Sequence, residues 1–456
     1  MKSLVDTLKN IYKVEELRNR ILTTLGLVLI YRLGSFIVLP GVDPQQLDQY
    51  ASQSSEGILG LINMFAGGAF SRASIFALGI MPYISASIVI QLMGIVVPYF
   101  QKLQKEGESG RNKMNQITRL LTIVITVVQS FGFLVNLQSQ VPNAIVSNVD
   151  PNLFSPFMFN LINVFLLTSG TMFVMWLGEK ITDRGIGNGI SLIIMIGIIA
   201  GLPGALFAEF DSRMVETGGG LVIFLVELVA LLGVILTVVL LVQGTRRIPV
   251  QYAKRVVGNR QYGGVRQFLP LKVNASGVMP IIFAQALMFL PSTLATFFEG
   301  SEAWQGFAGS LTDFTSFTYN FTFAILIILF TYFYTAVTIN PTQIADDLKR
   351  NGGFIPGVKP GKKTAEYIDS VMSRITLPGA IYLAFIAIFP AIAMLFNVNT
   401  QFAQFFGGTS LLIMVSVVLD TLQQVESHLL MRHYDGLMKT GRIKGRSNAM
   451  AGGVAG

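Results

Sequence analysis

The sequence predicts an all-α, polytopic membrane protein, and three observations lead to that prediction. Hydrophobic residues make up 52% of the 456 residues, charged residues only 13%, and the mean hydropathy is +0.59. A soluble domain carries about 25% charged residues. Apolar runs close to the length of about 20 residues that crosses a bilayer recur along the chain. Basic residues gather in alternate connections between these runs, as they do in membrane proteins of fixed orientation.

We expect ten membrane spans, preceded by a mixed-charge amphipathic segment over residues 1–20 that lacks the features of a cleavable signal. This segment is expected to lie on the cytoplasmic surface of the membrane. The fifth run is marginal in length. The runs cover residues 21–38, 75–97, 117–137, 157–177, 190–206, 221–242, 275–294, 321–339, 377–396 and 408–425.

The distribution of charge predicts the topology. Connections after the second, sixth and eighth runs, and the C-terminal tail, are rich in Lys and Arg, whereas the alternate connections are nearly free of them. The positive-inside rule therefore places both termini in the cytoplasm. Five runs precede the glycine-rich stretch 217–220 and five follow it, so the two halves have opposite orientations. We expect a first half over residues 21–206, an extracytoplasmic hinge over 207–220, a second half over 221–427 and a tail over 428–456.

A short apolar segment over residues 57–71 is too short to cross the membrane and is broken by Gly67 and Gly68. Irregular backbone at membrane depth is tolerated only where protein buries it or where it lines a cavity. The segment therefore predicts a half-helix beside a pore or binding site. The alternative is a short helix packed on the outer surface.

Two cytoplasmic connections, residues 243–272 and 342–375, are too long to be simple links. The first alternates apolar and basic residues on both sides of Gly263 and Gly264, which predicts a β-hairpin. The second contains a Gly/Pro-rich turn followed by a short amphipathic helix. Such loops serve either as docking surfaces for a cytoplasmic partner or as solvated surfaces that contact anionic lipid.

The chain lacks the motifs of an enzyme. It contains no cysteine, no phosphate-binding loop, no metal-ligand spacing and no catalytic triad, so we expect no cofactor, no metal site and no catalytic residues. The few charged residues inside spans, Arg32, Glu227 and Asp420, argue against a proton- or sodium-coupled carrier. Isoleucines at i, i+4 spacing, such as Ile80 and Ile84, either form a hydrophobic constriction or face lipid.

Eight stretches of the chain match a known family. They are FALGIMPYISASIVIQLM, KEGESGRNK, SGTMFVMWLGEKITDRGIGNGIS, RRIPVQYAKR, LPLKVNASGVMP, INPTQIADDLK, GGFIPGVKPGKKTAEYIDSVMSR and FGGTSLLIMVSVVLD. In order, from about residue 20 to residue 437, they resemble the SecY family of protein-conducting channel subunits. The resemblance implies a channel that translocates unfolded preproteins across the bacterial cytoplasmic membrane and releases apolar segments sideways into the bilayer.

The resemblance also assigns roles to residues. It implies a plug formed by Leu59, Leu61, Ile62, Asn63, Met64, Phe65, Gly67 and Gly68. It implies a pore ring of Ile80, Ile84, Ile190, Ile194, Ile282 and Ile413. It implies a lateral gate between spans two/three and seven/eight, with a polar cluster of Ser85, Gln129 and Asn274. Docking of the SecA ATPase or the ribosome is assigned to Arg246, Arg247, Lys254, Arg255 and Lys359.

One position departs from the family pattern. Lys359 in GVKPG stands where the family carries arginine, which keeps the charge and loses the planar two-pronged donor. The expected partners are SecE-like and SecG-like small membrane subunits, the SecA ATPase, the ribosome, preprotein and signal-sequence substrates, and membrane lipids. Two other classes remain as alternatives: an inverted-repeat secondary transporter, and a membrane scaffold that translocates nothing.

Overall fold

The computed structural model describes residues 14–47, 60, 63–145, 155–215, 220–252, 255–257, 260–262, 266–295 and 315–439. Its fold is largely helical, and each apolar run corresponds to one long helix. These helices are α2 (Glu15–Gly34), α5 (Met81–Val96), α7 (Glu108–Gln140), α9 (Pro156–Arg184), α10 (Gly189–Val215), α11 (Gly220–Gln243), α12 (Met279–Ala295), α14 (Phe317–Thr338), α16 (Lys362–Leu395) and α18 (Gly408–Lys439). Shorter helices are η1 (Pro44–Gln46), α6 (Pro98–Lys105), η2 (Pro142–Ala144), α15 (Pro341–Arg350) and α17 (Thr400–Ala403).

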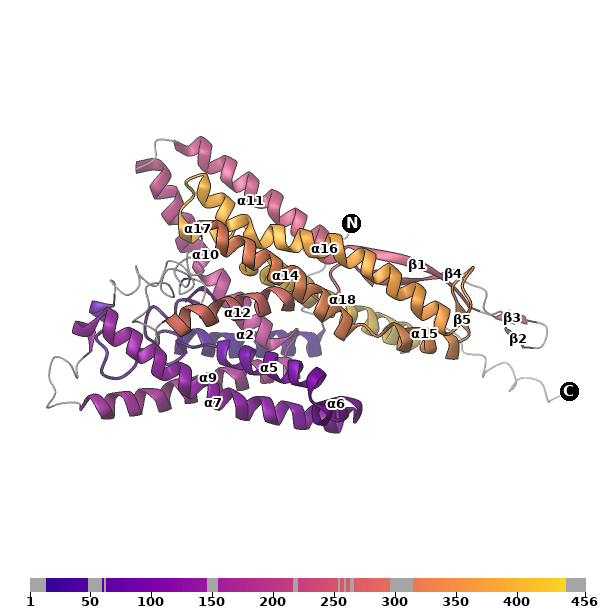
Figure 1. Ribbon diagram of the computed structural model, residues 1–456, viewed down its shortest axis with the longest axis horizontal. Coiled ribbons are helices and arrows are strands. Elements are labelled where there is room, and N and C mark those ends of the chain that lie inside the picture. The colour runs from indigo at the N-terminus through magenta and orange to yellow at the C-terminus, as the bar shows by residue number, and fades with distance from the viewer. Residues whose placement is uncertain are drawn as a thin grey trace.

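The long helices form two groups (Figure 1). Helices α2, α5, α7 and α9 lie on one side, and α11, α14, α16 and α18 lie on the other. Helix α10 contacts members of both groups, including α9, α11 and α18. One apolar core, which includes Leu134, Phe159 and Leu167, underlies the first group and extends to the start of α18, and a second, around Tyr319 and Leu383, underlies the other.

Three of the predicted spans are less regular than expected. Among the described residues, seven helices are long and apolar enough to cross a membrane alone, and α2, α5 and α12 are not among them. Helix α2 carries charged residues at both ends, and α5 and α12 have only 16 and 17 residues. Helices α5 and α12 begin later than expected because turns occupy residues 75–80 and 275–278, which lie inside the expected runs. The count of ten spans therefore stays a prediction.

The irregular stretch before α5 is satisfied by pairing with another irregular stretch. The amide of Ile75 donates to the carbonyl of Ile37 at 2.9 Å, and the amide of Leu39 donates to the carbonyl of Ala73 at 2.9 Å. Almost every residue between 66 and 80 is buried. Because buried backbone groups must find partners inside the protein, this short ladder allows a non-helical segment to lie within the bundle.

Two helices extend further than the apolar runs indicated. Helix α10 continues through residues 207–215, which we had assigned to the connection between halves, and residues 216–219 lie outside the described part. Helix α16 is continuous over 34 residues. The short amphipathic helix expected in the second cytoplasmic loop was therefore wrong as a separate element. The helix continues from this segment into the following span through Pro378, which lies near the start of the span, so the segment forms the first part of α16.

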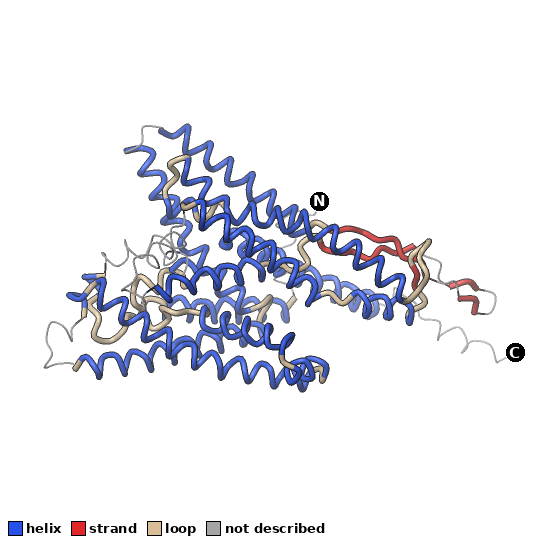
Figure 2. The backbone as a smooth tube through the Cα atoms, viewed as in Figure 1, coloured by secondary structure: helices blue, strands red, loops and turns tan. Residues whose placement is uncertain are grey.

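The predicted hairpin is present (Figure 2). Its register is centred between Val257 and Arg260, which lie opposite each other, and not at Gly263 and Gly264, where the sequence pattern placed the turn. Strand β1 (Thr245–Tyr252) pairs antiparallel with β4 (Arg266–Lys272), with Ile248 opposite Leu269. Strands β2 (Arg255–Val257) and β3 (Arg260–Tyr262) pair between them, and β5 (Gly353–Phe354) adds to the other edge of β1. Ile248 and Val250 pack in one apolar cluster with Ile368 and Met372 of α16, so the sheet is seated on the extended helix.

Close packing of α9 against the irregular stretch leads to a testable prediction. A Cβ added at Gly170 would overlap the carbonyl oxygen of Ile75, whereas a Cβ at Gly233 of α11 would meet nothing within 4 Å. We expect Gly170→Ala to lower the free energy of unfolding by about 1–3 kcal/mol, as overpacking does. Gly233→Ala, the matched control, should be neutral or stabilising by about 0.5–1 kcal/mol. Thermal unfolding in detergent measures both, and equal midpoints would contradict the packing.

Candidate functional site

A small cavity lies where four helices begin. Its volume is about 30 Å³, which leaves room for no more than a few waters. The residues around it come from the first two turns of α5, α10, α12 and α18 and from the irregular stretch before α5. They are Phe65, Ala66, Leu78, Gly79, Ile80, Met81, Ile84, Ser85, Ile194, Ile282, Gln285 and Ile413.

The structure brings five of the six predicted ring isoleucines around this cavity. Ile80 precedes α5, and the other four lie near the starts of their helices. Ile190 does not line it. Its side chain packs against α9 at Gly178, where any side chain larger than hydrogen would meet it. The i, i+4 spacing put Ile190 and Ile194 on one helix face, and it could not indicate that α9 covers the earlier residue.

The chemistry of the cavity is that of a hydrophobic barrier. Its polar lining side chains are Ser85 and Gln285, and the lining contains no titratable group. Water is held poorly in a narrow apolar constriction, and ions that would have to shed their hydration there are blocked. The site can therefore act as a seal.

One wall of the cavity comes from the segment predicted to be a half-helix. Residues 63–65 are helical, and the chain then turns through Gly67 and Gly68, whose φ values are +64° and +81°. Leu59, Leu61 and Ile62 lie outside the described residues. A Cβ at Gly67 would lie 3.0 Å from the Cα of Gly197 in α10. Two requirements, a left-handed backbone and close packing on α10, thus favour glycine at this break.

The carbonyl groups of this break are held by two arginines. Arg32 of α2 donates through Nη1 to the carbonyl of Gly67 at 3.1 Å, and Arg72 donates through Nη2 to the same oxygen at 3.0 Å. Arg72 also donates through Nε to the carbonyl of Gly68 at 2.9 Å. The Arg72 guanidinium lies 4.2 Å from the centre of the Phe36 ring, a cation–π contact.

These arginines were missed as functional residues. Arg32 is one of the few charges inside an apolar run, and such a charge indicates a partner at membrane depth. That signal could have singled out Arg32. Nothing in the sequence showed that its partner is a glycine carbonyl 35 residues away. Tyr31, its neighbour, adds a hydrogen bond from its hydroxyl to the carbonyl of Ala66 at 3.3 Å.

The polar cluster predicted at the lateral gate is not joined by hydrogen bonds in the part of the chain that the structure describes. The hydroxyl of Ser85 donates to the carbonyl of Met81 at 3.1 Å, within α5. Asn274 is buried and accepts a hydrogen bond from Ser276 at 3.2 Å. Gln129 lies half-buried on α7. The role of these residues stays a prediction.

The two long loops that were expected to be cytoplasmic form one surface. Because β5 pairs with β1, residues of the second loop lie beside the hairpin of the first. Arg246 and Arg247 are exposed on β1, and Lys359 is exposed in the turn before α16. Lys254 and the side chain of Arg255 lie outside the described part. Lys363 donates to Glu366 at 2.8 Å, and this hydrogen bond raises the pKa of the lysine and lowers that of the glutamate.

Comparisons with known proteins agree on one family. Residues 74–422 match the family model described as SecY. The chain is 44% identical to the protein translocase subunit SecY of Vibrio cholerae, over 95% of this chain and 96% of that protein. It is 42% identical to the subunit of the same name from Streptomyces galbus, over 94% and 98%.

Solved structures support the same fold at lower sequence identity. A structure described as a protein conducting channel covers 90% of this chain, with 92% of its own length matched, a TM-score of 0.59 and 17% identity. The canine Sec61 of a ribosome–channel complex covers the same shares with a TM-score of 0.56 and 16% identity. Family model, relatives and fold together place this chain in the SecY family.

Proposed function

We propose that this chain is the channel subunit of a protein translocase, which conducts unfolded polypeptide across a membrane. The observation that carries the proposal is the cavity at which isoleucines from α5, α10, α12 and α18 meet. An apolar constriction built from separate helices can widen when the helices part and fit closely around an extended chain. Ions would then be excluded by that fit rather than by charge.

The size of the cavity supports a closed state of the channel. A volume of about 30 Å³ is too small for a polypeptide. Opening requires residues 63–68, the described part of the plug, to leave the wall of the cavity. The hydrogen bonds from Arg32 and Arg72 to Gly67 would break in that movement. We therefore assign the two arginines to the closed position of the plug.

Sideways release of apolar segments would use the boundary between α5/α7 and α12/α14. Ser85 and Asn274 would lie at that boundary, as the family resemblance implies. A signal sequence or span of about 20 apolar residues that reached it would partition into lipid. The two halves would separate about the connection between α10 and α11.

Two kinds of exposed surface, a basic sheet and apolar helix faces, support the partners that we propose. The basic sheet formed by β1, β4 and β5 would receive the SecA ATPase or the ribosome, whose work would drive translocation, so the chain itself would be no enzyme. SecE-like and SecG-like subunits and membrane lipids would cover the exposed apolar faces of helices such as α11. The location would be the bacterial cytoplasmic membrane, with both termini in the cytoplasm.

Crosslinking tests the channel directly. The chain contains no cysteine, so Ile84→Cys introduces a single thiol at the constriction. A secretory protein with its own cysteine, stalled midway through export, should form a disulfide with it. Val229→Cys on α11, which is 69% exposed, is the control and should not react. Export without a crosslink at position 84, 194 or 282 would show that the route lies elsewhere and would favour a scaffold.

Loss of the arginine contacts should open the seal. We expect Arg32→Met and Arg72→Met to raise ion flux through the resting channel in proteoliposomes, because each removes charged hydrogen bonds of about 1.5–3 kcal/mol. An increase of about tenfold corresponds to 1.4 kcal/mol. Arg20→Met, at the opposite end of α2, is the control. If both variants showed the same ion flux as the unsubstituted chain, the arginines would have no role in holding the plug in its closed position.

The basic sheet can be tested by charge reversal. Arg247→Glu should weaken stimulation of SecA ATPase activity by the channel, and the loss should shrink at high salt because exposed charges are screened. Lys359→Arg separates two models of that position. A purely electrostatic role predicts no change, and a two-pronged role predicts a gain. Full stimulation by the Arg247→Glu variant at low salt would argue against docking at this sheet.

A further inference from the structure

Three charged side chains are buried together near the connection between the two halves. Glu209 and Arg213 belong to α10, and Glu227 belongs to α11. Their exposed fractions are 0%, 4% and 7%. The sequence predicts a connecting loop at Glu209 and Arg213, where solvent would surround both charges. In the structure they lie inside the bundle, where an unpaired charge costs several kcal/mol.

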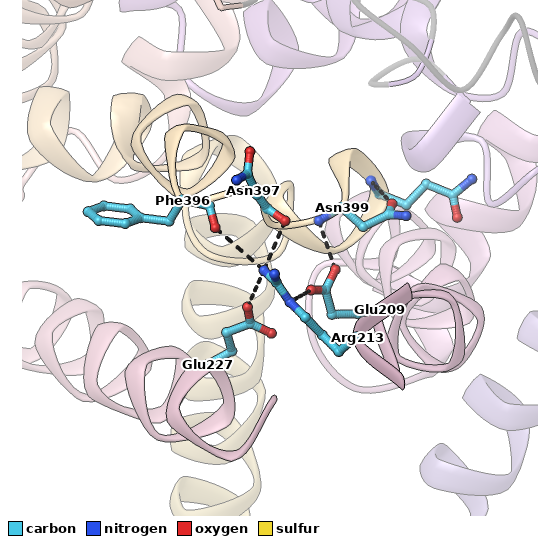
Figure 3. Close-up of polar contacts among 7 residues, drawn as sticks. Glu209, Arg213, Glu227, Phe396, Asn397 and Asn399 are labelled. Atoms are coloured by element: carbon cyan, nitrogen blue, oxygen red, sulfur yellow. Dashed lines mark hydrogen bonds and ion pairs between the residues drawn. The ribbon is translucent and has the colours of Figure 1, made fainter. Parts of the chain in front are cut away.

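Arg213 is the centre of this cluster (Figure 3). Its Nε donates to Glu209 Oε1 at 2.8 Å, and its Nη2 donates to Glu227 Oε1 at 2.5 Å. The same Nη2 donates to the carbonyl of Asn397 at 2.9 Å and, at the longer distance of 3.5 Å, to that of Phe396. The planar guanidinium thus holds four acceptors, which a lysine ammonium could not do in this geometry.

Glu209 extends the cluster to the backbone of the connection between α16 and α18. Its Oε2 accepts a hydrogen bond from the amide of Asn399 at 2.7 Å. Asn399 caps α17 through its side chain, which accepts from the amide of Gln401 at 3.0 Å. Asn397, the residue whose carbonyl meets Arg213, has a φ of +59°. The cluster therefore fixes a bent backbone segment whose own geometry is strained.

This segment runs along α10 from the cluster to the constriction. Asn397 and Asn399 contact Arg213 and Glu209 at one end. Further along, Phe405 lies beside Gly201, where a Cβ would be 3.7 Å from its ring. At the other end Ile413 and Ile194 line the same cavity. Residues 397–413 and α10 thus form one continuous contact, with the ion cluster at one end and the seal at the other.

The energetics favour a positioning role over a simple stabilising one. A buried ion pair contributes little net stability compared with well-packed apolar residues, while the loss of one partner is strongly destabilising because the other charge stays buried. A buried cluster of this kind is specific in geometry, since the acceptors must stay where the guanidinium can reach them. Here the acceptors come from α10, from α11 and from the segment before α18.

We propose that Arg213 is a positioning residue that ties α10 to α11 and to the segment before α18, and so holds Ile413 against Ile194 at the constriction. The proposal rests on the proposed function only in that the constriction seals a channel. The tie, meaning the contacts by which Arg213 joins α10 to α11 and to the segment before α18, concerns geometry alone. It predicts that a change about 20 residues along α10 from Ile194 alters the distance between two isoleucines that it does not touch.

The first measurement is the rate of disulfide formation between Ile194→Cys and Ile413→Cys in the otherwise cysteine-free chain, reconstituted in liposomes. We expect Arg213→Met to slow this reaction by about tenfold, the scale of one lost charged hydrogen bond. Asp211→Asn, which removes an exposed charge two residues away on the same helix, is the matched control and should leave the rate unchanged.

A second variant, Arg213→Lys, keeps the test valid if Arg213→Met does not fold. It keeps a positive charge between the two carboxylates and loses the multiple donors, so we expect a folded protein with an intermediate rate. Equal rates for Arg213, Arg213→Lys and Arg213→Met would overturn the tie. Ion flux separates this inference from the proposed function: a slowed disulfide without any rise in flux would keep the tie and contradict the sealing role of the constriction.

Discussion

The structure depends on one constraint, the need to satisfy irregular backbone at membrane depth. Residues 66–80 are not helical. Many of their backbone groups pair in local turns, and others pair with residues 37 and 39 and with Arg32 and Arg72. Without such partners each buried amide or carbonyl would cost several kcal/mol. The two arginines are therefore part of what allows this non-helical segment to lie inside an apolar interior.

The same constraint accounts for the position of the constriction. Helices α5 and α12 begin late because turns precede them, and the isoleucines of the cavity lie just before α5, in the case of Ile80, or in the first two turns of their helices. Helices that begin within the bundle bring short apolar side chains together at a single level. The seal is thus made by packing between separate elements, which can separate and return without breaking any helix.

Much of this architecture was predictable from the sequence, because each apolar run became one long helix and the alternation around Gly263 and Gly264 became a hairpin. Periodicity also grouped Ile80 with Ile84. It could not reveal long-range partners. Three contacts join residues that are far apart in the chain. They are the hydrogen bond from Arg32 to the carbonyl of Gly67, the hydrogen bonds from Arg213 to backbone carbonyls, and the pairing of β5 with β1. The length of α10 was not predicted because the charged residues at its end are typical of a loop. These charges are buried only because α10, α11 and the segment before α18 meet there.

Electrical recording across a planar bilayer tests the central claim, that apolar packing rather than charge seals this channel. The complete translocase would be recorded at rest and then with a stalled polypeptide in the pore. The account predicts almost no conductance in either state, because the plug and the isoleucines close the first and the close fit around the chain closes the second. A large, steady conductance at rest, with the plug and both arginines intact, would contradict it.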